Sequence, residues 1–149
     1  MKNVIVFALG QTRYAVELRW VREVFTLGPV TPVAHAPDAV AGVVNYRGAI
    51  VPILDLDVLL GRAAAQHSPV RSGEGAILIE VEEVRAALRV TSVVEVSSLR
   101  PEAGGEVLLD SSGRPVPLVE PPALVARARS LAESAAHAAD ATPAGGRGA

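Results

Sequence analysis

The chain has 149 residues, of which half are hydrophobic and a fifth are charged, so one domain with a sizeable core is the simplest expectation. A net charge of −2 and an aromatic content of 3% argue against nucleic-acid binding, which needs a positive field and rings that stack on bases. The absence of cysteine excludes disulfides, thiol catalysis and Cys-based zinc sites.

The N-terminal stretch Met1–Gly10 carries one lysine and only a short apolar run, with no small-residue cleavage site after it. It therefore lacks the features of a signal peptide. No apolar run in the sequence approaches the roughly 18 residues that indicate a membrane span. We expect a soluble, cytoplasmic protein.

Short strands dominate the prediction for the first half of the chain. They are Val4–Leu9, Tyr14–Leu18, a proline-containing edge segment at Val30–Val33, Val40–Val44 and Ile50–Leu54. Between Leu18 and Phe25 the apolar spacing lengthens to three or four, which predicts a turn or two of helix. A tight turn is predicted at Asn45–Gly48, and a short helical turn at Asp57–Leu60.

The second half repeats this succession of strands after a predicted loop over residues 62–75. The expected strands are Ala76–Val81, Val84–Val90 with one wet face, and a hairpin of Val107–Leu109 with Val116–Val119. Ser97–Glu106 is predicted to be a polar loop. The alanine-rich segment Ala123–Ala139 favours a helix, and Ala141–Ala149 has the composition of a disordered tail.

The two halves also resemble each other in sequence. Gly48-Ala-Ile-Val-Pro-Ile-Leu-Asp55 returns 65 residues later as Gly113-Arg-Pro-Val-Pro-Leu-Val-Glu120, and Ile5–Phe7 returns 72 residues later as Ile77–Ile79. Chance similarity between amphipathic strands is the alternative, but the order of elements repeats as well. About five short strands in each half would leave exposed edges unless each half curls into a small barrel. The prolines at 52 and 117 would then mark places where a strand lacks a ladder partner or bulges.

An ordered set of motifs gives this chain a resemblance to a known family. Phe7-x-Leu9-Gly10, Tyr14-x-Val16, Val21-Arg-Glu-Val24, Ala41-Gly-Val-Val-Asn-Tyr-Arg-Gly48 and Ile50-Val-Pro-Ile-Leu-Asp-Leu56 together resemble the chemotaxis coupling protein family CheW. The resemblance covers about residues 2–125 and is strongest over 2–61. It implies an all-β fold of two five-stranded SH3-like barrels packed together. The expected domain is 1–127, with its motifs in 4–61 and 76–122, followed by an alanine- and glycine-rich tail at 128–149.

The resemblance implies an adaptor without catalysis, cofactor or metal. Its partners would be the cytoplasmic signalling tip of a methyl-accepting chemoreceptor, the regulatory domain of a CheA-type histidine kinase and other CheW-like proteins, at membrane-associated receptor arrays. No nucleic-acid partner and no membrane insertion are expected. The family's receptor-facing positions correspond to Val21, Glu23, Gly42, Asn45, Arg47 and Gly48. Further interface candidates are Trp20 and Tyr46, and the kinase-side candidates are Thr91, Ser92 and Val93.

Each of these residues also has a purely structural interpretation. Glu23 and Arg47 match an acid and an arginine that pair in the family, and an exposed pair of this kind contributes under ~1 kcal/mol to stability. Asn45 could hydrogen-bond its own turn. Val21 could belong to the core. Trp20 lies out of step with the apolar set, so it is either an exposed anchor or partly buried.

The second half departs from the family pattern. Val90-Thr-Ser-Val93 stands where the family has Val-Asp-x-Val, and the last strand ends in Glu120-Pro-Pro. A divergent member that serves a non-flagellar, surface-motility pathway and binds receptors with weak or no kinase coupling is therefore the alternative function.

Two other classes are weighed against the adaptor. An enzyme is disfavoured because His35, His67 and His137 are scattered without metal-ligand spacing, and no Gly-x-Ser-x-Gly elbow is present. Asp55 and Asp57 are interpreted as helix caps. An SH3-like nucleic-acid binder has only Gly145–Gly148 in its favour.

Overall fold

The computed structural model describes residues 1–62, 70–102 and 107–141, with side chains up to residue 134. Its strands are β1 (Lys2–Leu9), β2 (Thr12–Glu17), β3 (Val21–Thr26), β4 (Val30–Thr31), β5 (Val40–Tyr46), β6 (Ala49–Leu54), β7 (Gly75–Val81), β8 (Val84–Val90), β9 (Ser92–Pro101), β10 (Val107–Leu109) and β11 (Pro115–Val119). The helices are a 3₁₀ turn at Leu18–Trp20, α1 (Leu56–Leu59) and α2 (Pro121–Ala141).

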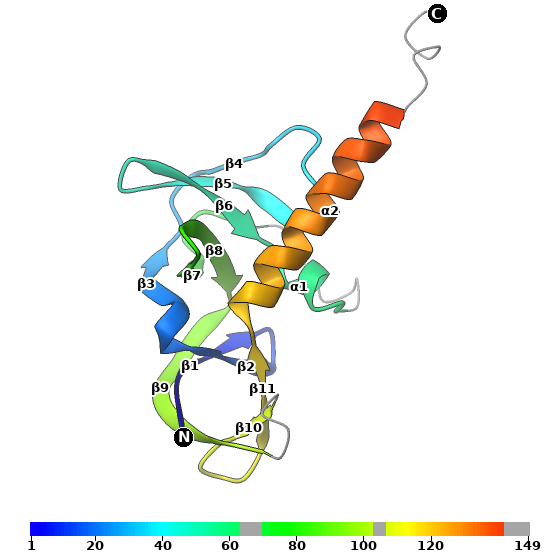
Figure 1. Cartoon of the computed structure of the whole chain (residues 1–149). Helices are drawn as coiled ribbons and strands as arrows, with labels where there is room; N and C mark the ends of the chain where they lie inside the picture. The colour runs from blue at the N-terminus through cyan, green and yellow to red at the C-terminus, as the bar shows by residue number, and fades with distance from the viewer. Residues whose placement is uncertain (63–69, 103–106, 142–149) are drawn as a thin grey trace, which may run out of the picture.

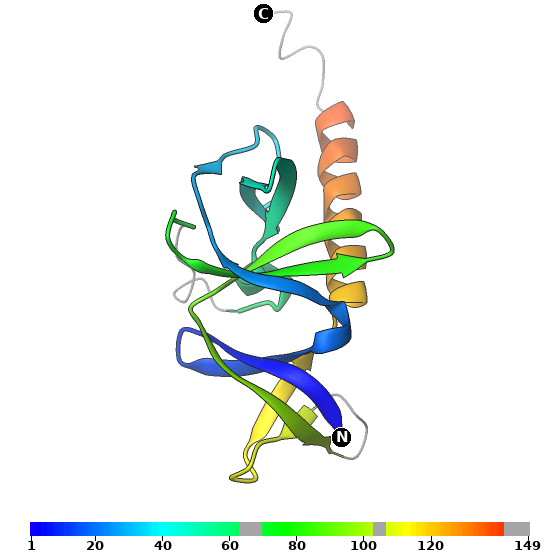
Figure 2. The same cartoon turned by 90° about the vertical axis from the view of Figure 1, so that its left-hand side faces the viewer.

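The strands form two sheets, which confirms the predicted all-β class. Five strands close into a barrel in the order β1-β2-β11-β10-β9, seen at the bottom of Figure 1. The other six form a second sheet in the order β3-β7-β8-β6-β5-β4, whose sixth member, β4, is only two residues long. Figure 2 shows the two sheets stacked, with α2 running beside the upper one.

The interpretation that each half of the sequence curls into its own barrel is wrong. The closed barrel combines β1 and β2 with β9, β10 and β11, while the second sheet combines β3 to β6 with β7 and β8. Two parallel pairings make this exchange. Leu118 of β11 pairs with Ala15 of β2, and Ile53 of β6 pairs with Ala87 of β8.

These two pairings are equivalent in the sequence repeat. Ile53 corresponds to Leu118 at the shift of 65 positions, and Ala15 corresponds to Ala87 at the shift of 72. Pro52 and Pro117 each stand one residue before the parallel pairing begins. Both prolines have a ladder partner on the antiparallel side, Val43 for Pro52 and Val107 for Pro117, so the prediction that the strand lacks a partner there holds only for the side on which the parallel pairing has not yet begun. The repeat is therefore real in the structure, but each repeat unit completes the other one's sheet.

Three hydrophobic clusters hold the fold together. One fills the closed barrel and includes Val4 and Val6. A second lies under the six-stranded sheet, and the largest lies between the sheets and includes Ile5 and Phe7. Because successive side chains of β1 alternate between the barrel interior and this junction, its central residues are buried on both faces. This explains the unbroken apolar run in the sequence.

Three local predictions are wrong for related reasons. The helix expected over Leu18–Phe25 is a single 3₁₀ turn followed by β3, because β3 pairs with β7. The loop expected over Ser97–Glu106 is strand as far as Pro101, because β9 pairs with β1; residues 103–106 lie outside the described part. The expected wet face of β8 is buried from Ala86 to Val90, because both sheets' cores contact it.

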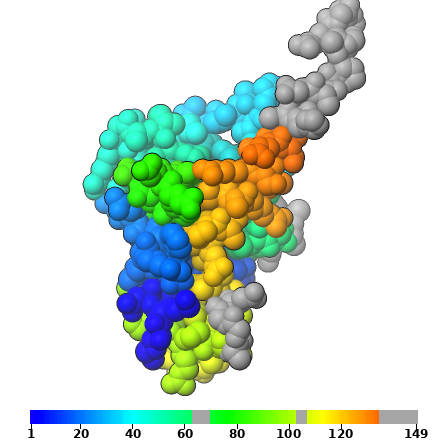
Figure 3. Space-filling model, in the orientation of Figure 1, coloured from blue at the N-terminus to red at the C-terminus, as the bar shows by residue number. Residues whose placement is uncertain are grey.

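The alanine-rich segment is helical, as predicted. α2 begins at Pro121, and proline suits a first turn because its missing N–H would be unpaired there. It buries Leu124 and Val125 against the junction of the sheets. In Figure 3 the green β7–β8 hairpin lies between β3, in blue, and this orange helix. Among the described residues, no helix combines the length and apolarity needed to cross a membrane. The tail beyond residue 141 lies outside the described part.

Candidate functional site

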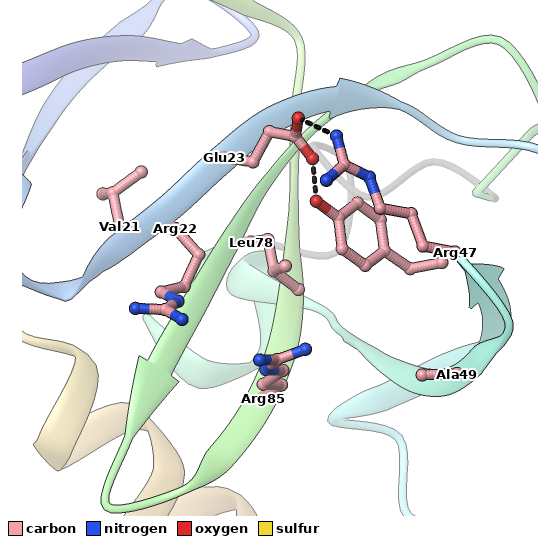
Figure 4. Close-up of a pocket in the computed structure, with 8 residues that line it drawn as sticks. Val21, Arg22, Glu23, Arg47, Ala49, Leu78 and Arg85 are labelled. Carbon is pink, nitrogen blue, oxygen red and sulfur yellow. Dashed lines mark hydrogen bonds and ion pairs between the residues drawn. The ribbon is translucent and has the colours of Figure 1, made fainter.

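A groove of about 360 Å³ lies between the two ends of the six-stranded sheet. Its walls come from β3, from the β5–β6 hairpin, from β7 and from β8. The lining residues are Val21, Arg22, Glu23, Tyr46, Arg47, Ala49, Leu78 and Arg85. Figure 4 shows Glu23 and Arg47 facing each other at one end, Arg22 and Arg85 at the other, and Leu78 between the two ends.

Side chains rather than backbone bonds bring the two ends of the sheet together. β3 stands at one end of the strand order and the β5–β6 hairpin near the other, so no ladder joins them. The Glu23 carboxylate accepts hydrogen bonds from the Tyr46 hydroxyl and, at 2.8 Å, from Arg47 Nη2. The rings of Phe25 and Tyr46 also meet, with centroids 5.0 Å apart. The groove therefore lies between the two ends of the six-stranded sheet, which side chains and not a backbone ladder bring together.

The hairpin turn sets the direction of Arg47. Arg47 and Gly48 both have positive φ, 49° and 87°, which is the conformation of a two-residue type I′ turn. Asn45 Oδ1 accepts a hydrogen bond from the Gly48 N–H at 2.9 Å, which confirms the predicted role of Asn45 in its own turn. Arg47 remains 73% exposed and Glu23 34% exposed, so the predicted pair is present and open to solvent.

The other end of the groove holds two arginines that share one carboxylate. Arg85 Nε donates to Glu80 Oε1 at 2.8 Å, and Arg22 Nε lies 3.8 Å from the same oxygen. The three side chains come from β8, β7 and β3, which are neighbours in the sheet. The hydrogen bond from Arg85, with the nearby charge of Arg22, lowers the pKa of Glu80 below its ordinary value of 4.5.

The remaining receptor-side candidates divide between groove and core. Val21 lines the groove but also packs against the core between the sheets. Trp20 is partly buried against the same core, with the Arg19 guanidinium 4.8 Å from its ring centroid. Gly42 lies buried under β4, where a Cβ would meet Val30 Cγ1 at 2.8 Å and Thr31 O at 2.9 Å. It does not line the groove.

The kinase-side candidates lie where β8 leads into β9, away from the groove. Thr91 Oγ1 accepts a hydrogen bond from the Gly10 N–H at 2.8 Å, and the Thr91 N–H donates to Ala8 O. Ser92 and Val93 are exposed. Further along β9, Val94 and Val96 are exposed as well, so this strand carries a run of apolar residues on the surface.

A buried ionic cluster is the feature that the sequence analysis missed most completely. Asp55 caps α1 by accepting from the Asp57 N–H at 2.9 Å, as predicted for a cap. Asp57 does not cap: it is 4% exposed, with Arg62 Nε at 2.7 Å from Oδ1 and Arg89 Nη2 at 3.4 Å from Oδ2. Arg62 also reaches the Tyr14 hydroxyl of the closed barrel. The cluster therefore ties the two sheets together.

Sequence reasoning did not find four of the groove residues, namely Arg22, Ala49, Leu78 and Arg85. The two arginines lie on strands predicted as helix or as a wet face, and nothing in the sequence placed them together. For the alternatives, no group of three metal-ligating side chains occurs within residues 1–62, 70–102 and 107–134. His67, the His137 side chain and Gly145–Gly148 lie outside the described residues.

Comparisons with known proteins agree with this architecture. A family model described as CheW-like domain matches residues 3–127. The chemotaxis protein CheW of Rhizobium meliloti is 42% identical over 65 residues, covering 44% of this chain and 42% of that protein. The chemotaxis protein CheW of Klebsiella aerogenes is 31% identical over 97 residues, covering 61% and 58%. The matched part of this chain thus spans about half the length of these relatives.

A solved structure is also similar. The scaffolding protein TtCheW from Thermoanaerobacter tengcongensis superposes with a TM-score of 0.65 over 78% of this chain and 87% of that chain. Its sequence identity of 22% makes this a likeness of fold.

Proposed function

Since the chain belongs to the CheW-like domain family, a family of non-catalytic scaffold proteins, we propose that it couples a chemoreceptor to a CheA-type histidine kinase. In this function the groove receives the cytoplasmic signalling tip of a methyl-accepting receptor, and the protein works at membrane-associated receptor arrays. Other CheW-like proteins would be neighbours in such arrays.

The observation that supports the groove as the receptor site is the meeting of predicted residues there. Val21, Glu23 and Arg47 come from two strand regions that the backbone ladder does not join, yet all three line one hollow. Arg47 is also held in a left-handed conformation, which most side chains avoid. Strain of this kind persists where the surrounding structure requires it and is often found at functional sites.

The kinase contact is proposed for Thr91, Ser92 and Val93, on the exposed start of β9. An exposed strand with apolar residues suits strand addition or apolar contact with a partner domain. The replacement of the family's aspartate by Thr91 does not remove a hydrogen-bond acceptor, because the Thr91 hydroxyl still accepts from Gly10. This bond holds the start of β9 against the β1–β2 turn, and a receptor-only adaptor in a surface-motility pathway stays the alternative.

The first test is co-elution of the purified chain with a receptor signalling tip and with a CheA regulatory domain from the same genome. Binding of both supports the coupler. Binding of the tip alone supports the receptor-only alternative. Binding of neither contradicts the proposal. DNA or RNA that co-elutes and dissociates at raised salt would instead favour a nucleic-acid binder.

The sharper test replaces Arg47. Asparagine tolerates a positive φ and suits a type I′ turn, so Arg47→Asn removes the guanidinium while keeping the hairpin, which Arg47→Ala does less well. We expect the free energy of unfolding to change by under ~1 kcal/mol, as for an exposed ion pair. We expect the dissociation constant for the receptor tip to rise on the order of tenfold.

Arg114→Asn, which replaces an exposed arginine in the β10–β11 turn, is the matched control and should leave tip binding unchanged. Thermal unfolding and titration of the tip are measured for both variants. A large loss of stability in Arg47→Asn would show that the arginine is structural, and the site assignment would then fail.

A further inference from the structure

The arginine pair at the far end of the groove has more donors than the protein uses. Each guanidinium carries five N–H donors. Arg85 makes one hydrogen bond to Glu80, and Arg22 approaches the same carboxylate only at ion-pair distance. Among the described residues no other carboxylate forms an ion pair with either arginine. Both remain open to solvent, at 55% and 44% exposure.

The groove is also positive on a chain that is negative overall. Three arginines line or border it, namely Arg22, Arg47 and Arg85, against the two carboxylates of Glu23 and Glu80. This leaves one positive charge in excess, whereas the whole chain carries −2. Between the charged ends lies Leu78, which is 1% exposed and belongs to the core beneath the groove.

We propose that the Arg22–Arg85 pair binds an acidic side chain of the receptor tip, and that this contact helps to select the receptor. The inference rests on the proposed function of the groove and specifies the chemistry of its partner. An Asp or Glu of the receptor tip binds at the arginine pair, on the exposed guanidinium groups.

The geometry favours a carboxylate over a neutral group for a physical reason. Arginine presents its donors in a planar fork that matches two carboxylate oxygens, and such charge-assisted bonds are roughly twice as strong as neutral ones. Glu80 Oε1 lies within ion-pair distance of both guanidinium groups, and the hydrogen bond from Arg85, with the charge of Arg22, lowers the pKa of its carboxyl. A second carboxylate can therefore bind without a large rearrangement.

The test measures binding of a recombinant receptor-tip hairpin to four versions of the full chain. These are the unmodified chain, Arg22→Gln, the double variant Arg22→Gln with Arg85→Gln, and the control Arg13→Gln, an exposed arginine of the closed barrel. We expect the double variant to bind on the order of tenfold more weakly, with a smaller dependence on salt, and the control to bind like the unmodified chain.

A second tip hairpin, with its acidic residues changed to the matching amides, makes the test specific. It should bind the unmodified chain more weakly, and the double variant should cause no further loss, because the interaction is already gone. Thermal unfolding checks that each variant folds. Arg22→Gln removes only a 3.8 Å ion pair, so it remains usable if the double variant is unstable.

Equal affinity of the tip for the unmodified chain, the double variant and the control would overturn this inference while leaving the proposed function standing. Failure of the unmodified chain to bind the tip would overturn both. Loss of binding in the double variant that is equally large with the amide-substituted tip would also overturn it, since the arginines would then be recognising something other than a carboxylate.

Discussion

At the scale of single residues, Gly42 shows how a family motif can carry a structural requirement. The motif analysis placed Gly42 on the receptor side, whereas the structure buries it beneath β4 with φ at +153°. Its Cα lies so close to β4 that an added Cβ would fall 2.8 Å from Val30 Cγ1 and 2.9 Å from the Thr31 carbonyl oxygen. Backbone atoms cannot yield there as a flexible side chain would.

We therefore predict that Gly42→Ala lowers the free energy of unfolding by about 1–3 kcal/mol, through overpacking and an unfavourable φ. Denaturant unfolding measures the change. Gly28→Ala is the matched control, because a Cβ at Gly28 meets nothing within 4 Å. Where Gly42→Ala remains folded, receptor-tip affinity should be unchanged. Lost affinity with unchanged stability would return Gly42 to the receptor-facing set.

The residues that sequence reasoning could place are those whose roles are local or belong to a motif. Asn45 hydrogen-bonds within its own turn, and Glu23 pairs with Arg47 as the family resemblance implied. Arg22 and Arg85 meet only because β3 and β8 both flank β7. No spacing within either segment indicates that arrangement, so the positive end of the groove required the structure.

At the scale of elements, the start of α1 carries two acids, Asp55 and Asp57, that look alike in sequence but have different roles. Asp55 and Asp57 were both interpreted as caps, yet Asp55 caps the helix and Asp57 points into the ionic cluster with Arg62 and Arg89. An exposed or half-buried cap can be replaced by another cap. A buried carboxylate between two arginines has no neutral substitute, because an amide there removes the one negative charge that both guanidinium groups contact, even though Arg89 also lies 3.6 Å from Glu74.

The two acids should thus respond very differently to the same amide substitution. We predict that Asp55→Asn changes the free energy of unfolding by less than ~0.5 kcal/mol, since asparagine caps about as well as aspartate. Asp57→Asn should cost about 3–5 kcal/mol. Urea unfolding of the two variants measures both. Similar, small effects would mean that Asp57 contributes no more than a surface pair.

The strands that were mispredicted share one cause. β3 and β8 carry apolar residues at spacings that suggest a helix or a half-wet strand, but both lie next to β7, whose two faces are buried. In such places, pairing with a neighbouring strand decides the secondary structure, whatever the spacing of apolar residues within the segment suggests. β1 and β7, whose apolar runs are continuous, were predicted within two residues because burial on both faces leaves its own signature.

At the scale of the whole molecule, the exchange of strands between the repeat halves decides how the chain can fold. The repeat itself was visible in the sequence, and so was the all-β class. The partner of each strand was not, because a parallel pairing such as that of β6 with β8 leaves no mark in either segment. Residues 1–62 supply β1 to β6, and residues from 70 onward supply β7 to β11 with α2.

Neither of these two segments contains a complete sheet. The closed barrel would lose β9, β10 and β11 in the first segment, and the second sheet would lose β7 and β8 from its middle. Each would also expose its share of the large core between the sheets, which draws on Ile5 and Phe7 from one segment and Ile77 and Leu88 from the other. A single segment therefore cannot bury enough apolar surface to offset its conformational entropy.

We predict that fragments 1–62 and 70–149, expressed separately, show no cooperative thermal unfolding and that mixing them restores a cooperative transition. Circular dichroism during heating measures this for each fragment and for the mixture, and the intact chain provides the reference. If the halves were independent barrels joined by a linker, each fragment would unfold cooperatively alone and mixing would change nothing. That result would contradict the exchanged topology, because strands paired across the two segments could not then be essential to either sheet.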